Sequence, residues 1–189
     1  MKNNYTSSFI TLAGVIGFVV IVTYLHFVQA DYDPVNQFMS ELALGRHGSL
    51  MFWAFMSFAV SVAGSINILA AYKVHPAIRL LLGMGSLSLA GAGVFTLGDA
   101  ATLHIALIAL AFFLLVLSMY LIPRITTAFQ KPLTTAVCWG LGAGTALFVG
   151  LGQGPLPIGI AQRLAAACIL GWLAWLAILN LKQKEGLGV

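Results

Sequence analysis

The 189-residue chain is 60% hydrophobic and only 7% charged, whereas soluble domains carry about a quarter charged residues. A chain of this size has too little interior to bury so much apolar surface, which excludes a soluble domain and points to the lipid bilayer as its solvent. The net charge of +4 comes from cations scattered singly between apolar stretches. This spacing argues against a nucleic-acid partner and is typical of a membrane topology signal.

Six apolar stretches follow one another along the chain, each close to the roughly 20 residues that a membrane-spanning helix needs. Helices are expected because an open strand cannot satisfy its backbone in lipid. The first stretch is longer than the apolar core of a signal peptide, about 7–15 residues, so we expect it to span the membrane. We predict an all-α polytopic protein with one domain over residues 1–189. The predicted spans are residues 8–29, 49–71, 80–99, 102–122, 133–152 and 159–181.

The loops between these spans differ in charge. One side carries seven of the nine lysines and arginines: Lys2, Lys73, Arg79, Arg124, Lys131, Lys182 and Lys184. The other side carries Arg46 and Arg163 with four of the five acidic residues. Positively charged loops remain in the cytoplasm. We therefore predict a multi-pass protein of the cell inner or plasma membrane with both termini cytoplasmic and the acidic side on the outer face.

The first connection, residues 30–48, contains a predicted short helix. Asp33 before Pro34 is typical of an N-cap followed by proline at the first helical position. Apolar residues then recur at helical spacing, and Gly45 is suited to end a helix. We predict an amphipathic surface helix over residues 34–44. Its apolar side chains would face lipid or the bundle, and its other face would carry Gln37, Ser40 and Glu41.

Ionisable groups near the membrane are costly unless they are paired or used, and several lie at the predicted outer end. Asp99 precedes His104 by five residues, so it is expected either to cap the fourth span or to orient His104 as a general base. The alternative for His104 is a buried histidine with satisfied hydrogen bonds. Arg163 lies where the helix macrodipole disfavours a cation, so we expect Asp99, Glu41 or a lipid phosphate beside it. Ser40 and Glu41 are further candidate binding residues, with a solvated surface position as the alternative.

Three histidines are the candidate ligands for a metal ion. His26, His47 and His104 fall near the predicted outer end, and zinc takes three or four ligands of this kind. They come from separate segments, however, and no His-x-x-x-His pair is present. We therefore predict no metal and no cofactor, with zinc or haem as the alternative.

Three short patterns resemble one membrane protein family, in order and over most of the chain. They are Tyr32-Asp33-Pro34 followed by Ser40-Glu41-Leu42, then Gly93-Val94-Phe95 with Asp99 and His104, then Gly159-Ile160-Ala161-Gln162-Arg163-Leu164. The family is the widespread prokaryotic group catalogued as domain of unknown function 998. Thr96 stands where the family often has a proline, which bears on the end of the third helix. The resemblance implies a six-helix bundle and, through a distant similarity to eukaryotic proteins of lipid remodelling, a link to lipids.

We therefore expect a lipid-handling protein, with membrane lipids as partners and a pocket opening to the outer leaflet. In an enzymatic version, a lipid hydrolase or transferase, His104 would act as general base, Asp99 would orient it, and Arg163 would hold a phosphate or an oxyanion. The alternatives are a transporter or proton-coupled channel and a structural or accessory subunit. An apolar cavity with a polar mouth would favour lipid handling. A polar cavity near the midplane would favour transport, and a bundle with neither would favour the structural role.

Overall fold

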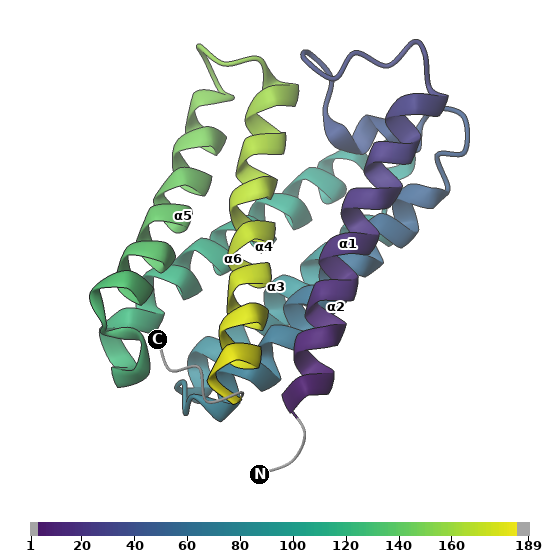
Figure 1. The fold of residues 1–189 in the computed structure, drawn as a ribbon. Helices are drawn as coiled ribbons and strands as arrows, with labels where there is room; N and C mark the ends of the chain where they lie inside the picture. Colours follow the sequence, from purple (N-terminus) through teal and green to yellow (C-terminus); the bar gives the residue numbers. More distant parts are fainter. Residues whose placement is uncertain (1–3, 185–189) are drawn as a thin grey trace.

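The computed structural model describes residues 4–184, which fold into six long helices joined by short connections (Figure 1). The helices are α1 (Asn4–Val28), α2 (Leu50–Ala71), α3 (Pro76–Val94), α4 (Leu97–Ile125), α5 (Pro132–Leu151) and α6 (Ile158–Lys184), with short 3-10 helices η1 (Met39–Ala43) and η2 (Thr127–Phe129). All six long helices have the length and apolar composition to cross a membrane. The predicted all-α polytopic fold is confirmed. Lys2, which entered the predicted topology, lies outside the described residues.

The third and fourth spans begin four or five residues before their predicted starts, because polar caps set where they begin. The His75 ring accepts a hydrogen bond from the Ala77 amide at 3.2 Å, and Pro76 follows at the first helical position. The Thr96 hydroxyl accepts from the Asp99 amide at 3.3 Å. Thr96 is therefore the N-cap of α4.

Consecutive helices pack against one another, and α6 closes the ring against α1 while also touching α2. Figure 1 shows α1, α5 and α6 in one layer, with α4 passing obliquely behind α6. The start of α1 and the end of α6 lie at the same end of the bundle, here called the terminal end. The opposite end, called the distal end, is formed by residues 29–49, 95–96 and 152–157.

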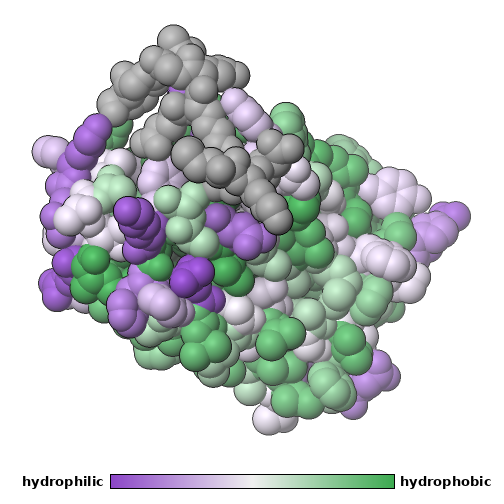
Figure 2. Space-filling view, turned by 90° about the horizontal axis from the view of Figure 1, so that it is seen from below, coloured by the Kyte–Doolittle hydropathy of each residue, from purple (hydrophilic) through white to green (hydrophobic). Residues whose placement is uncertain are grey.

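The surface of the bundle is suited to a bilayer. Large apolar side chains stand exposed on its sides, such as Phe27 at 84% and Leu87 at 74%, a distribution that lipid accommodates and water does not. Figure 2 looks onto the terminal end, where hydrophilic side chains lie among hydrophobic ones. At this end the Arg124 guanidinium lies 4.1 Å from the centre of the Tyr120 ring. An aromatic ring beside a cation is typical of a membrane boundary.

The predicted short helix over residues 34–44 is present only in part, as the 3-10 helix η1 (Met39–Ala43). The segment instead forms a turn after Asp33, an extended residue at Phe38 (φ −60°, ψ 142°) and then the short helix η1. Its carbonyl groups are taken by partners elsewhere in the fold, which leaves few for a continuous helix. Pro34 O accepts from Arg163, and Val35 O accepts from the Gly159 amide at 3.0 Å.

The helix η1 closes the distal end of the bundle rather than lying on its surface. It contacts α1, α2, α4 and α6, and Leu42 is completely buried. Ser40, predicted on the polar outward face, is only 3% exposed. The predicted amphipathic faces assumed an α-helix with 3.6 residues per turn. A 3-10 helix has about 3.0 residues per turn, so its side chains face other directions.

Candidate functional site

Arg163 binds the loop between α1 and α2, residues 29–49 and here called the distal loop, to α6. One terminal nitrogen, Nη1, donates to Pro34 O and to Gly159 O, both at 2.7 Å. The other, Nη2, lies 2.8 Å from His26 Nε2 and donates to the Tyr32 hydroxyl. The guanidinium also lies 5.5 Å from the centre of the Tyr32 ring. Arg163 therefore joins α1, the loop and α6 through a planar fork of donors.

The partners of Arg163 are neutral. A guanidinium only donates, so His26 Nε2 accepts, and the ring proton lies on Nδ1, 2.7 Å from Val22 O. Burial raises the pKa of the Tyr32 phenol above 10.0 in spite of Arg163, so the phenol stays protonated. Among residues 4–184, Arg163 forms no ion pair with a carboxylate. The expected pairing with Asp99 or Glu41 is not formed, and carbonyl dipoles with two neutral side chains take its place.

Backbone contacts fix the same loop on α6. The Gly159 amide donates to Val35 O at 3.0 Å. A Cβ atom at Gly159 would lie 2.4 Å from Pro34 O and 2.5 Å from Gln37 O, so only glycine permits this approach. Gln162 Oε1 accepts from the Met39 amide at 2.6 Å. The loop and the start of α6 therefore behave as one unit that holds η1 in place.

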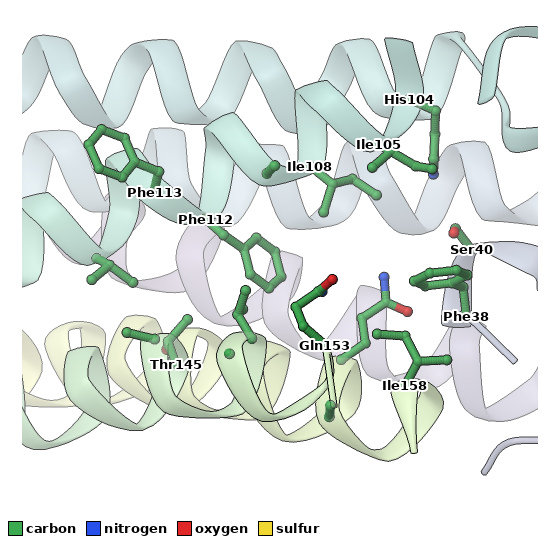
Figure 3. A pocket seen from close by; sticks show the side chains of 17 residues that line it. Phe38, Ser40, His104, Ile105, Ile108, Phe112, Phe113, Thr145, Gln153 and Ile158 are labelled. Atoms are coloured by element: carbon green, nitrogen blue, oxygen red, sulfur yellow. The ribbon is translucent and has the colours of Figure 1, made fainter. Parts of the chain in front are cut away.

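A pocket of about 430 Å³ lies between α4, α5, the start of α6 and η1. Its walls are mostly apolar: Phe38, Ile105, Ile108, Ala109, Phe112, Phe113, Val116, Ala146, Val149, Gly150, Ile158 and Ala161. The polar lining residues are Ser40, His104, Thr145, Gln153 and Gln162. Figure 3 shows His104, Ser40 and Phe38 together at one end of the pocket and Phe113 at the other.

The pocket is long and opens on the side of the bundle. Along α4 it extends from His104 to Val116, which corresponds to about 18 Å of helix, more than half of a hydrocarbon core of about 30 Å. Ile105 is 50% exposed, Phe113 63% and Val149 43%. These three residues belong to the pocket lining and to the outer surface of α4 and α5. The opening therefore faces the apolar surroundings of the bundle.

His104 lies at the distal end of this pocket and is 1% exposed. Its Nδ1 atom lies 2.8 Å from both Ala92 O and Phe95 O. Two carbonyl acceptors require a proton on Nδ1, so in the neutral ring Nε2 carries the lone pair. Nε2 is buried and has no hydrogen-bond partner among the described residues. A buried nitrogen without a partner costs about 1–3 kcal/mol and requires an explanation.

Two polar groups accompany His104. The Ser40 side chain faces it in Figure 3, and within residues 4–184 its hydroxyl forms no hydrogen bond. Gln162 uses its oxygen on the Met39 amide, which leaves its NH₂ group as a free donor at the pocket. The polar end thus offers an acceptor at His104, a donor at Gln162 and a hydroxyl with both capacities at Ser40.

The other predicted site residues form local hydrogen bonds outside the pocket. Asp99 is exposed and accepts from the Thr96 hydroxyl at 2.5 Å, so it does not orient His104; the carbonyls of α3 do. Glu41 accepts from the Phe38 amide at 2.8 Å and from the Gln37 amide group at 3.0 Å. Neither carboxylate lines the pocket.

The three histidines considered as metal ligands are engaged separately. His26 is bonded to Arg163, and His104 borders the pocket. His47 is exposed, with a positive φ of 59°. In the part of the chain that the structure describes, no three His, Cys, Asp or Glu side chains are grouped as a metal site would need.

Sequence reasoning missed Gln162 and Tyr32 as site residues. Both stood in the sequence patterns that carried the family resemblance, beside Arg163 and Asp33. The available signal was an amide side chain within the first turns of a predicted span, where an unpaired polar group is costly. The apolar lining residues gave no such signal, because lipid-facing and pocket-facing positions have the same composition.

The fold and its surface define a polytopic helical membrane protein with a side-opening apolar pocket. The chain belongs to the family described as a protein of unknown function (DUF998), whose model matches residues 12–179. The match contains all six spanning helices in whole or in large part. No curated protein and no solved structure matches the chain.

Proposed function

We propose that this protein binds a membrane lipid, with the lipid's chain in the pocket and its polar end beside His104 and Ser40. The observation that carries the proposal is the buried, unpartnered Nε2 of His104 at the polar end of an apolar pocket. Ligand pockets of about 300–1,000 Å³ with few polar groups are typical of small-molecule sites. The pocket falls within that range.

Access from the bilayer supports a lipid over a water-soluble ligand. The opening lies between lipid-exposed side chains of α4 and α5, including Phe113 and Val149. A transporter would need polar groups at mid-depth, whereas here the lining beyond His104 is apolar apart from Thr145 and Gln153. The Thr145 hydroxyl already donates to Leu141 O at 2.9 Å. The geometry therefore favours lipid binding over transport.

The charge distribution supports an orientation for the bound lipid. Exposed cations gather at the terminal end, including Lys73, Lys131 and Lys182. By the positive-inside preference, the terminal end faces the cytoplasm and the distal end lies outside. His104 lies about 10 Å along α4 from its first residue, so the bound lipid would belong to the outer leaflet.

Blocking the pocket without disturbing the fold tests the proposal. A Cβ atom at Gly150, which borders the pocket, meets nothing within 4 Å, and the same holds for Gly140, three turns earlier on α5 and outside the pocket lining. We expect Gly150→Trp to reduce co-purified lipid at least tenfold in native mass spectrometry, while Gly140→Trp retains it. Equal lipid in both variants would contradict the proposal.

A lipid hydrolase or transferase is a second candidate, favoured by the Ser40 side chain facing His104. The Ser40 oxygen would attack an ester carbonyl and pass its proton to His104 Nε2, which would return it to the leaving alcohol; water would then release the acyl group by the same route. Catalytic hydrogen bonds are often long before substrate binds. Release of fatty acid from an ester lipid, abolished in Ser40→Ala, is the expected result. No release by the wild-type protein would exclude this candidate.

A further inference from the structure

The lining of the pocket contains no fixed charge. None of its 17 residues is Asp, Glu, Lys or Arg. Arg163, next to Gln162 in sequence, lies outside the lining, and its terminal nitrogens are bonded to the loop and α6. A phosphate or an ammonium group in this pocket would be buried without a counter-charge, which is strongly unfavourable. The lining therefore selects against charged headgroups.

The polar end matches a hydroxyl group. His104 Nε2 has no hydrogen-bond partner among the described residues, and the Ser40 hydroxyl can donate to or accept from a ligand. Gln162 has a free NH₂ group, since its oxygen is used by the Met39 amide. A hydroxyl donates one hydrogen bond and accepts others. It can therefore donate to His104 Nε2 and accept from Ser40 or Gln162, whereas an ester or a methyl end cannot donate.

We propose that the ligand is a neutral lipid with a free hydroxyl group, such as a monoacylglycerol or a long-chain alcohol, and that Ser40, His104 and Gln162 recognise the hydroxyl. This inference rests on the proposed lipid binding and specifies the chemistry of the headgroup. Phospholipids, which carry a phosphate, are excluded from the pocket by the absence of a cation in its lining.

Three ligands with the same oleoyl chain separate these possibilities. They are 1-oleoylglycerol, which has free hydroxyls, methyl oleate, which has none, and 1-oleoyl lysophosphatidate, which adds a phosphate. Each is titrated into the purified full-length protein, and binding is measured by native mass spectrometry. We expect 1-oleoylglycerol to bind at least tenfold more tightly than the other two. Tighter binding of lysophosphatidate, or equal binding of all three, would overturn the inference.

Variants assign the preference to the polar end. His104→Phe keeps a ring of similar size but removes the acceptor, and Ser40→Ala removes only a hydroxyl. We expect either change to bring 1-oleoylglycerol to within about twofold of methyl oleate, with methyl oleate binding unchanged. Preference retained in both variants would overturn the assignment, and Ser40→Ala tests it even if His104→Phe fails to fold.

The Gly150→Trp variant distinguishes failure of this inference from failure of the proposed function. If all three ligands bind equally in the wild-type protein and none binds in Gly150→Trp, the pocket binds lipid but does not read the hydroxyl. If binding of every ligand is unaffected by Gly150→Trp, the lipids lie elsewhere on the bundle, and both proposals fall.

Discussion

Removing the guanidinium of Arg163 should release the distal loop from α6. Arg163→Met removes four hydrogen bonds from a charged donor: two to the loop, at Pro34 O and the Tyr32 hydroxyl, one to His26 on α1 and one to Gly159 O within α6. The bond to Pro34 O is exposed, so water can replace it, whereas those to His26 and Tyr32 are partly buried. A hydrogen bond to a charged group contributes about 1.5–3 kcal/mol. The bond to Gly159 O stays within α6, so the loss is taken from the two partly buried bonds that leave α6, to His26 and Tyr32; at the lower end they give about 3 kcal/mol in the free energy of unfolding.

Thermal unfolding in detergent measures this loss. By the scaling of soluble domains of this size, about 3 kcal/mol corresponds to a fall in Tm of about 6–12 °C. Hydrogen exchange should locate the effect at residues 33–43, with amides exchanging at least tenfold faster. Arg163→Lys keeps the charge but lacks the planar fork of donors, so its Tm and its exchange rates should lie between those of the wild-type protein and Arg163→Met.

The matched control is Arg46→Met, which removes a cation that lies in the distal loop itself. Arg46 is exposed, and its backbone oxygen, not its side chain, accepts from Gln29 at 2.8 Å. We expect a change within about 0.5 kcal/mol, as for surface substitutions generally. If Arg163→Met were no more destabilising than Arg46→Met, the role of Arg163 as the fastening between loop and α6 would be refuted.

Three further changes test other parts of the structure. Gly159→Ala should destabilise the protein by at least about 2 kcal/mol, because the added methyl group overlaps carbonyl oxygens of the distal loop. Gly154→Ala should be neutral, because a Cβ atom there meets nothing within 4 Å. Thermal unfolding compares the two variants. Tyr72→Phe should stabilise by up to about 1 kcal/mol, because the Tyr72 hydroxyl is buried without a partner. Burial raises the pKa of Tyr72 from 10.0 to about 12, so wild-type stability should fall as the pH rises through that window and fall less in the variant. The side-chain amide of Asn36 lowers the pKa of Asp33 below 3.8. The Asp33 carboxylate should therefore hold the turn at residues 33–36 above pH 3.8, and amide exchange there should be protected until the pH falls further. Loss of this protection already at pH 5 would contradict the prediction.

The spanning helices could be predicted because their signal is local. About 20 consecutive apolar residues determine a helix in lipid whatever its neighbours. The residues at which α3 and α4 begin were harder to predict, because His75 and Thr96 act as N-caps only through their conformation. Apolarity alone predicted those starts a few residues too late.

The distal loop and the pocket depend on tertiary contacts, which explains where sequence reasoning failed. Residues 34–44 have a helical pattern, but Arg163 and Gly159 take the carbonyls that a helix would use. Asp99 and His104 are close in sequence, yet the break at Ala100 (φ −148°, ψ 60°) separates the cap from the helix that carries His104. His104, singled out from the sequence, borders the pocket, although its partners are backbone carbonyls that no side-chain motif could reveal.

Photochemical labelling tests lipid binding in the pocket most directly. An acylglycerol with a diazirine in the middle of its chain is added to the wild-type protein in detergent, irradiated, and the labelled peptides are mapped by mass spectrometry. The proposed site predicts labels between Ile105 and Val116 on α4 and between Thr145 and Gln153 on α5, which disappear in Gly150→Trp. Labels spread evenly over exposed apolar residues such as Phe9 and Phe27 on α1, and unchanged in that variant, would contradict it.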